Sequence, residues 1–115
     1  MNHDLGSLLI LQQTAQLSHD QLRACSQDDF DHHIRLQATV THHLLTVAAI
    51  ARQLPEATKQ QVAAVDWVKL QNLRDSLVDD ADNLQPDRVW QCVQTDISAL
   101  LATLSPYLPP YLPPN

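Results

Sequence analysis

Apolar residues recur at spacings of three and four along most of the chain, which is the period of an α-helix. This pattern predicts a first helix from Asp4 to Cys25. The residues on its predicted buried face are Leu5, Leu8, Leu9, Gln12, Ala15 and Leu22. The first part of the chain is therefore expected to form one long amphipathic helix.

A second helix is predicted to be longer, at about 25 residues, and to end at Leu54, because Pro55 disfavours a helical conformation in the residue before it. Residues 26–29 supply side-chain oxygens and negative charge for its start. The residues predicted along one stripe of this helix are Phe30, Ile34, Ala38, Thr41, Leu45, Ala48 and Arg52, with Leu44, Val47 and Ala51 beside it. Residues 56–65 are expected to form a loop or a short helical turn.

Two more helices are predicted in the second half of the chain. Asp66 should cap the third helix, whose apolar residues are Trp67, Leu70, Leu73, Leu77 and Val78. Residues 79–85 break the pattern, and Pro86 fits the first turn of a fourth helix, where its missing N–H costs nothing. The buried stripe of that helix should consist of Val89, Trp90, Val93, Ile97, Leu100, Leu101 and Leu104.

The last ten residues are rich in proline. The tetrapeptide Tyr-Leu-Pro-Pro occurs twice, at 107–110 and 111–114, and five of the seven prolines fall in residues 106–115. Such a density of proline favours extended polyproline II structure and excludes a helix. We therefore predict two parts: a helical bundle over residues 1–105, and a proline-rich tail over 106–115 that is loose or docked on the bundle.

The composition supports a helical fold. Hydrophobic residues make up 44% of the 115 residues, aromatic residues only 4%, and there is one glycine. A β-sandwich or barrel needs glycine-rich turns and aromatic or β-branched strands. One glycine also excludes the glycine-rich phosphate-binding motifs. The predicted fold class is all-α: an up-and-down four-helix bundle with a short extra helix or turn.

The net charge of −6 disfavours non-specific binding of nucleic acid, because an acidic surface repels phosphate. The longest strongly apolar run, residues 8–11, is far shorter than the ~20 residues of a membrane span. The N-terminal residues lack the basic region of a secretory signal. Cys25 and Cys92 are expected to be reduced thiols. These features predict a soluble, cytoplasmic protein without membrane contact.

Two histidine pairs, at 32–33 and 42–43, raise the question of a metal site. His32 and His43 share a helix face only after about three turns, some 16 Å apart, so one ion cannot bridge them. The acidic residues of the 75–82 segment match no calcium loop, since they lack its glycine turn and terminal glutamate. We predict no metal and no cofactor, and interpret the histidines as solvated surface residues.

Residues 65–81, 89–93 and 97–100 resemble the HepT-like proteins of the HEPN superfamily, the ribonuclease toxins of paired toxin–antitoxin systems. The positions that fall in register with that family are Trp67, Leu70, Leu73, Arg74, Leu77, Val78, Val89 and Trp90. The resemblance implies an all-α homodimer whose partner is a minimal nucleotidyltransferase antitoxin.

In that family an R-x4-H-x-Y motif is held to cut RNA without metal at a dimer interface, and its tyrosine receives AMP from the antitoxin. The resemblance places Arg74 at the arginine, Asp79 at the histidine and Ala81 at the tyrosine. Asp75 stands where an asparagine usually follows the arginine, and Ala48-Ala49 stands where the family has glycine-glutamate. Arg74 and Asp79 are thus the candidate catalytic positions, and Asp75 and Ala81 the candidate binding positions.

Aspartate, with an ordinary pKa of about 3.9, is a weak base and no acid at neutral pH. Losing a general acid–base group costs roughly 10²- to 10⁴-fold in rate. The main hypothesis is therefore a HepT-like homologue without ribonuclease activity, with Arg74 paired to Asp75 or Asp79 or holding a dimer interface. It would act by protein or nucleotide binding, with RNA binding not expected. Two alternatives stay open: an active metal-independent endoribonuclease toxin using Arg74 and an aspartate, and a free-standing ligand-binding bundle.

Overall fold

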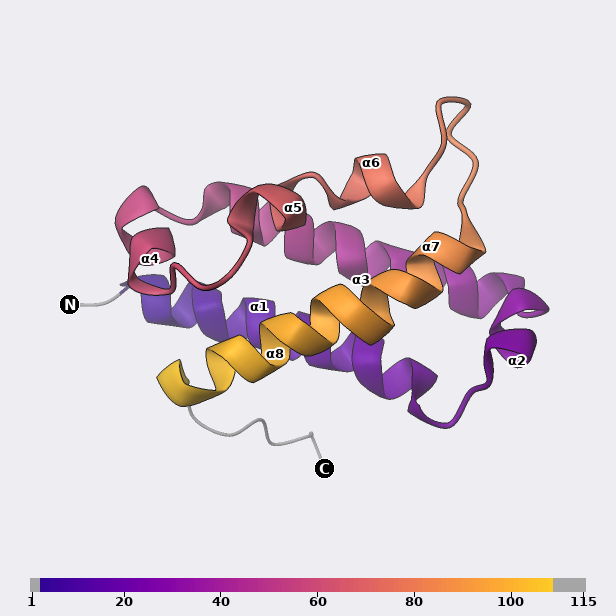
Figure 1. Ribbon diagram of the computed structural model, residues 1–115, viewed down its shortest axis with the longest axis horizontal. Coiled ribbons are helices and arrows are strands. Elements are labelled where there is room, and N and C mark those ends of the chain that lie inside the picture. Colours follow the sequence, from indigo (N-terminus) through magenta and orange to yellow (C-terminus); the bar gives the residue numbers. More distant parts are fainter. Residues whose placement is uncertain (1–2, 109–115) are drawn as a thin grey trace.

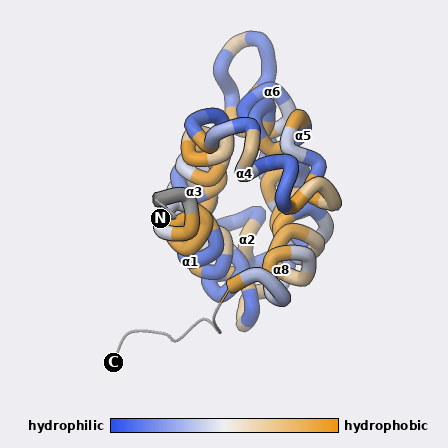
Figure 2. Tube along the Cα trace, turned by 90° about the vertical axis from the view of Figure 1, so that its left-hand side faces the viewer, coloured by the Kyte–Doolittle hydropathy of each residue, from blue (hydrophilic) through white to orange (hydrophobic). Residues whose placement is uncertain are grey.

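The computed structural model describes residues 3–108 and consists of helices that run in alternating directions (Figure 1). α1 (His3–Arg23) packs along α3 (Ile34–Gln53), and the later helices cover the other side of α3 and α1. The hydrophobic sides of α1, α3 and α8 (Ser98–Leu104) turn toward one another (Figure 2). The all-α prediction is confirmed.

The buried face of α1 differs in phase from the predicted one. The residues that α1 buries are Leu8, Leu11, Gln12, Ala15, Ser18 and Leu22. Leu5, predicted on this face, is 39% exposed because it points about 90° away from the centre of the buried arc. Leu9 is only half-buried.

The predicted second helix is divided into two. α2 (Gln27–Asp31) is a single turn that ends before His32, and α3 begins at Ile34. His33 caps α3, since its Nδ1 accepts the backbone N–H of Leu36 at 3.1 Å. The Gln37 side-chain amide donates to the carbonyl of Phe30 at 2.8 Å. These side chains bond to backbone groups that have no helical partner at the break. The prediction of one continuous helix is therefore wrong.

The buried face of α3 overlaps the predicted one, because the predicted residues Thr41, Leu44, Val47, Ala48 and Ala51 are buried, but it is rotated from the predicted stripe. Its buried residues are Gln37, Val40, Thr41, Leu44, Val47, Ala48 and Ala51. The predicted residues Ile34, Ala38 and Leu45 lie about 80–120° from the centre of this arc. Ile34 is accordingly 80% exposed.

Residues 56–65 contain the expected short helical turn, α4 (Glu56–Gln61). Asp66 caps α5 (Trp67–Gln71), accepting the backbone N–H of Lys69 at 3.1 Å, as predicted. The predicted third helix is interrupted at Asn72, and α6 (Leu73–Leu77) follows. The Asn72 side chain donates to the carbonyl of Val68 at 2.8 Å, which competes with the backbone bonds of a continuous helix.

The predicted fourth helix consists of α7 (Pro86–Gln91), a π-helical turn η1 (Cys92–Ile97) and α8 without a break. Pro86 lies in its first turn, as predicted. Val89, Val93 and Ile97 are all fully buried. In an α-helix a step of four residues turns about 40° past a full turn, so Ile97 would point about 80° away from Val89. The wider π turn absorbs this drift.

After α8, residues Ser105–Tyr107 form the 3₁₀ turn η2, and Leu108 is buried on the core. The start of the proline-rich segment therefore continues the helical path rather than forming the expected polyproline II structure. Residues 109–115, which hold most of the Tyr-Leu-Pro-Pro repeat, lie outside the described residues. No helix within 3–108 is long and apolar enough to cross a membrane.

Candidate functional site

The four candidate residues lie on α6 and on the loop that follows it. Residues 79–83 project from the molecule beyond α6 (Figure 1), and this loop is hydrophilic (Figure 2). Its base is closed by an antiparallel bridge between Val78 and Leu84. The backbone N–H of Asp79 donates to the carbonyl of Asn83 at 2.9 Å, which tightens the loop further.

Asp79 is the hydrogen-bonding centre of this loop. Its Oδ1 accepts the backbone N–H groups of Ala81 and Asn83, each at 2.9 Å. Its Oδ2 faces the side-chain amides of Asn83 at 3.5 Å and Gln85 at 3.3 Å. The backbone hydrogen bond from Asn83 is the main cause that lowers the pKa of Asp79 below its ordinary value. The carboxylate is therefore charged and occupied by the loop itself.

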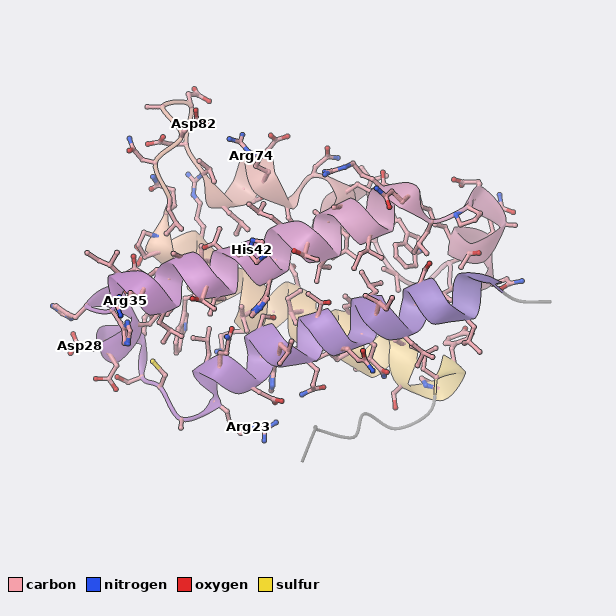
Figure 3. All side chains as sticks on the ribbon, turned by 180° about the vertical axis from the view of Figure 1, so that it is seen from behind. Arg23, Asp28, Arg35, His42, Arg74 and Asp82 are labelled. Carbon is pink, nitrogen blue, oxygen red and sulfur yellow. The ribbon has the colours of Figure 1, made fainter. Side chains whose placement is uncertain are left out.

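Arg74 pairs with Asp82, not with Asp75 or Asp79 as expected. The Arg74 Nη2 donates to Asp82 Oδ1 at 2.8 Å. Asp82 has a positive φ of 62°, a conformation that aspartate adopts more readily than most residues, and it carries the loop back toward α6. Both side chains are exposed at one edge of the molecule (Figure 3), so the ion pair is screened by solvent.

The remaining candidates lie around this pair. Ala81 is exposed at the loop tip, where its N–H is held by Asp79. Asp75, also exposed, lines a groove between α6 and α7 together with Asp87 and Arg88. Ala48 is buried in α3, apart from the surface loop. The structure thus brings Arg74, Asp79 and Ala81 together on one surface and places Asp75 beside a neighbouring groove.

The histidines take part in separate local contacts. His32 Nδ1 lies 2.8 Å from the carbonyl oxygen of Asp28, and this hydrogen bond is the main cause that raises the pKa of His32. His43 Nδ1 lies 3.1 Å from Gln21 Oε1, and partial burial lowers the pKa of His43. Among residues 3–108 no three histidine, cysteine or acidic side chains gather as potential metal ligands.

One further feature was not indicated by the sequence pattern. A hollow of about 200 Å³ lies between α5 and the C-terminal helix, with Lys69 and Asp96 paired at its edge by a 2.8 Å contact. These two residues are far apart in the sequence and come from different predicted helices. Cys92 lies beside them, and its burial raises the pKa of the thiol to about 12. Neither Cys92 nor the half-buried Cys25 forms a disulfide.

The fold and the loop define an all-α protein in which an arginine on α6 pairs with an aspartate of a projecting acidic loop. A family model described as ribonuclease HepT-like matches residues 10–106. The chain belongs to the ribonuclease HepT-like family. No curated protein and no solved structure matches the chain.

Proposed function

We propose that this HepT-like protein does not cleave RNA and acts by binding other molecules. The observation that carries the proposal is the environment of Asp79, which takes the place of the family's histidine. Its carboxylate accepts two backbone hydrogen bonds of 2.9 Å inside its own loop. A general base must have its acceptor available for the substrate proton and a pKa near the working pH. Two backbone N–H groups already bond to Oδ1 of Asp79. The pKa of its carboxyl lies below the ordinary aspartate value, further from neutral pH.

The charges around Arg74 support the same proposal. The guanidinium is held by Asp82, and Asp75, Asp79 and Asp80 are exposed nearby on α6 and the loop. A scissile phosphate approaching Arg74 would meet this negative field and would have to displace the Asp82 carboxylate. Arg23 and Arg35 lie on other helices, away from Arg74 (Figure 3), and add no positive patch at this edge.

The binding partners that we propose are a second copy of the chain and a minimal nucleotidyltransferase antitoxin. Large apolar side chains are exposed on several helices, including Ile10 at 54% and Val68 at 69%. A protein of this size gains stability when such groups are buried between subunits. Ala81 has no hydroxyl group to accept AMP, so contact with the antitoxin at this position would be non-covalent.

The test is RNA cleavage by the purified protein without added metal. We expect the wild type to show no more cleavage than Arg74→Ala, which serves as the control for contaminating nuclease. Cleavage by the wild type that disappears in Arg74→Ala would establish the alternative, an active endoribonuclease, and overturn the proposal.

A second arm restores the family motif with Asp79→His and Ala81→Tyr together. Gain of cleavage in this variant would show that the residues at positions 79 and 81 silence the protein. Asp79→His also weakens the hydrogen bonding of the loop. The thermal unfolding of the restored variant is therefore compared with that of Asp79→Asn.

The partners are tested separately. Light scattering after gel filtration should give twice the mass of one chain, and Val68→Asp or Ile10→Asp should shift the protein toward the monomer. Co-expression with a minimal nucleotidyltransferase encoded beside this gene should give a complex that purifies together. A monomeric protein that captures no such nucleotidyltransferase contradicts the binding role.

A further inference from the structure

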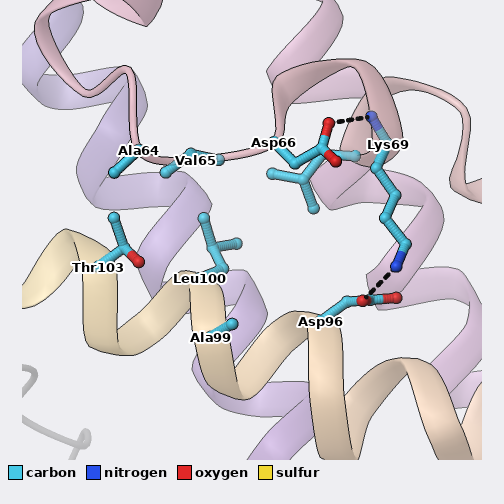
Figure 4. A pocket seen from close by; sticks show the side chains of 9 residues that line it. Ala64, Val65, Asp66, Lys69, Asp96, Ala99, Leu100 and Thr103 are labelled. Carbon is cyan, nitrogen blue, oxygen red and sulfur yellow. Dashed lines mark hydrogen bonds and ion pairs between the residues drawn. The ribbon is translucent and has the colours of Figure 1, made fainter.

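The hollow beside α5 has an apolar floor and a charged edge. Val65, Leu70, Ala99 and Leu100 contribute the apolar surface, from the segment before α5, from α5 itself and from α8 (Figure 4). The hollow is distinct from the Arg74 loop, whose residues do not line it. Its position between two helical layers makes it a pre-formed concave site of the kind that binds small molecules.

Three charged side chains surround this floor. The ammonium of Lys69 reaches from α5 across to η1 and contacts Asp96 Oδ1 at 2.8 Å, closing one end (Figure 4). Asp66 also lines the hollow, with its Oδ1 bound to the backbone N–H of Lys69. Two carboxylates and one ammonium group therefore line the hollow, and the charged lining carries a net charge of −1.

We propose that this hollow binds a small organic cation, a primary amine on a short apolar chain, whose ammonium group replaces that of Lys69 at Asp96. The apolar chain of the ligand would cover the Leu70 and Leu100 side chains. Lys69 would swing into solvent. This binding role is separate from the function proposed for the Arg74 loop.

The difference in exposure between the paired residues favours a cation over an anion. The Asp96 side chain is 23% exposed, whereas that of Lys69 is 56% exposed. When an amine displaces Lys69, the carboxylate keeps a positive partner and the released lysine ammonium becomes hydrated. An anion that drew Lys69 away would instead leave Asp96 half-buried without a partner, which costs free energy.

The size and local geometry limit the ligand further. A volume of about 200 Å³ is below the ~300–1,000 Å³ of pockets that hold drug-sized molecules, so a nucleotide is too large. Asp96 lies within the π turn η1, and such turns occur often at functional sites in other proteins. The hollow therefore suits a short alkylamine.

The experiment is an NMR titration of the ¹⁵N-labelled full chain with n-butylamine hydrochloride. We expect saturable amide shifts in residues 64–70 and 96–103. Sodium butyrate and n-butanol, which have the same apolar chain, should not produce them. Equal shifts with n-butanol, larger shifts with butyrate, or no saturable shift with the amine would each overturn the proposal.

Three variants separate this site from general attraction to an acidic protein. Asp96→Asn should weaken amine binding about tenfold or more, because a charge-assisted hydrogen bond is lost. Lys69→Ala should tighten it, because the competing ammonium is removed. Asp80→Asn makes the same charge change as Asp96→Asn on the exposed loop and should leave binding unchanged.

Two outcomes for these variants would contradict the role assigned to Asp96. Loss of binding in Lys69→Ala, or equal weakening by Asp80→Asn and Asp96→Asn, would show that Asp96 is not the binding group. Because the ion pair of Asp96 is with an exposed lysine, the amide spectrum of Asp96→Asn should otherwise match that of the wild type.

Discussion

A carboxylate can accept several hydrogen bonds at once, whereas a neutral imidazole can accept only one. Asp79 uses this capacity to hold the backbone N–H groups of Ala81 and Asn83. If Asp79 stands at the histidine position, as the resemblance implies, the aspartate there determines the structure of the loop as well as its chemistry. The carboxylate that would have to serve as a base is therefore the group that organises the loop.

Removal of this acceptor should loosen the loop. In Asp79→Ala the amide hydrogens of Ala81 and Asn83 should exchange with solvent faster than in the wild type, because both lose their acceptor. Asp79→Asn keeps a side-chain oxygen and should stay close to the wild type. Hydrogen exchange followed by NMR measures this, and unchanged exchange in Asp79→Ala would contradict the assigned role.

The pH dependence has a defined sign. The folded-state pKa of Asp79 lies below its unfolded value, so its contribution to stability is present above the unfolded pKa and is lost as the pH falls through the folded pKa. Thermal unfolding of the wild type should therefore depend more steeply on pH than that of Asp79→Asn, below the ordinary aspartate pKa of about 3.9. Identical pH profiles would show that the loop does not favour the charged form.

At the element scale, local side-chain caps decide where helices begin and end. Ser26 and Asp29 form a capping box at the start of α2, in which Ser26 Oγ accepts the N–H of Asp29 at 3.0 Å. α2 is short, and its buried Phe30 lies 5.7 Å from the Trp90 ring, centroid to centroid. The cap fixes the entry of this aromatic side chain into the core.

Ser26→Ala should lower the free energy of unfolding by about 1 kcal/mol, because one N-terminal N–H of α2 loses its acceptor. Ser76→Ala on exposed α6 removes a hydroxyl group outside any cap and should change stability by less than about 0.5 kcal/mol. Urea denaturation measures both variants. Equal changes in the free energy of unfolding in the two variants would mean that the capping box does not stabilise α2.

The sequence was sufficient to locate the helices but not to place their interruptions. The period of apolar residues, the Asp66 cap and Pro86 at a first turn all predicted the observed elements. The breaks at His33 and Asn72 were missed because they depend on side chains that bond to the backbone only after the chain has folded. The π turn was missed because the apolar spacing there is also compatible with an α-helix.

The candidate site was predictable in its residues but not in its contacts. The resemblance named Arg74 and Asp79. These residues lie on adjoining segments because only four residues separate them in the sequence. The Arg74–Asp82 pair depends on the left-handed backbone of Asp82, which the sequence pattern does not specify. The Lys69–Asp96 pair joins distant segments and was found only from the tertiary structure.

At the scale of the whole molecule, one core joins all the longer helices. Leu44 lies on the buried face of α3 with no exposed surface, whereas its neighbour Leu45 is half-buried. Leu44→Ala should cost ~2–5 kcal/mol, because a cavity is left among packed side chains. Leu45→Ala removes the same atoms and should cost clearly less. Urea denaturation of the two variants compares them, and equal losses would contradict the observed phase of α3.

The hydrogen-bonded loop around Asp79 also limits how this protein could change over generations. A single change of Asp79 to histidine would leave at least one of the N–H groups of Ala81 and Asn83 without an acceptor before any catalytic gain. Tyrosine at position 81 would bring no benefit until the histidine was in place. A change of this chain toward the motif that the resemblance implies therefore requires coordinated substitutions.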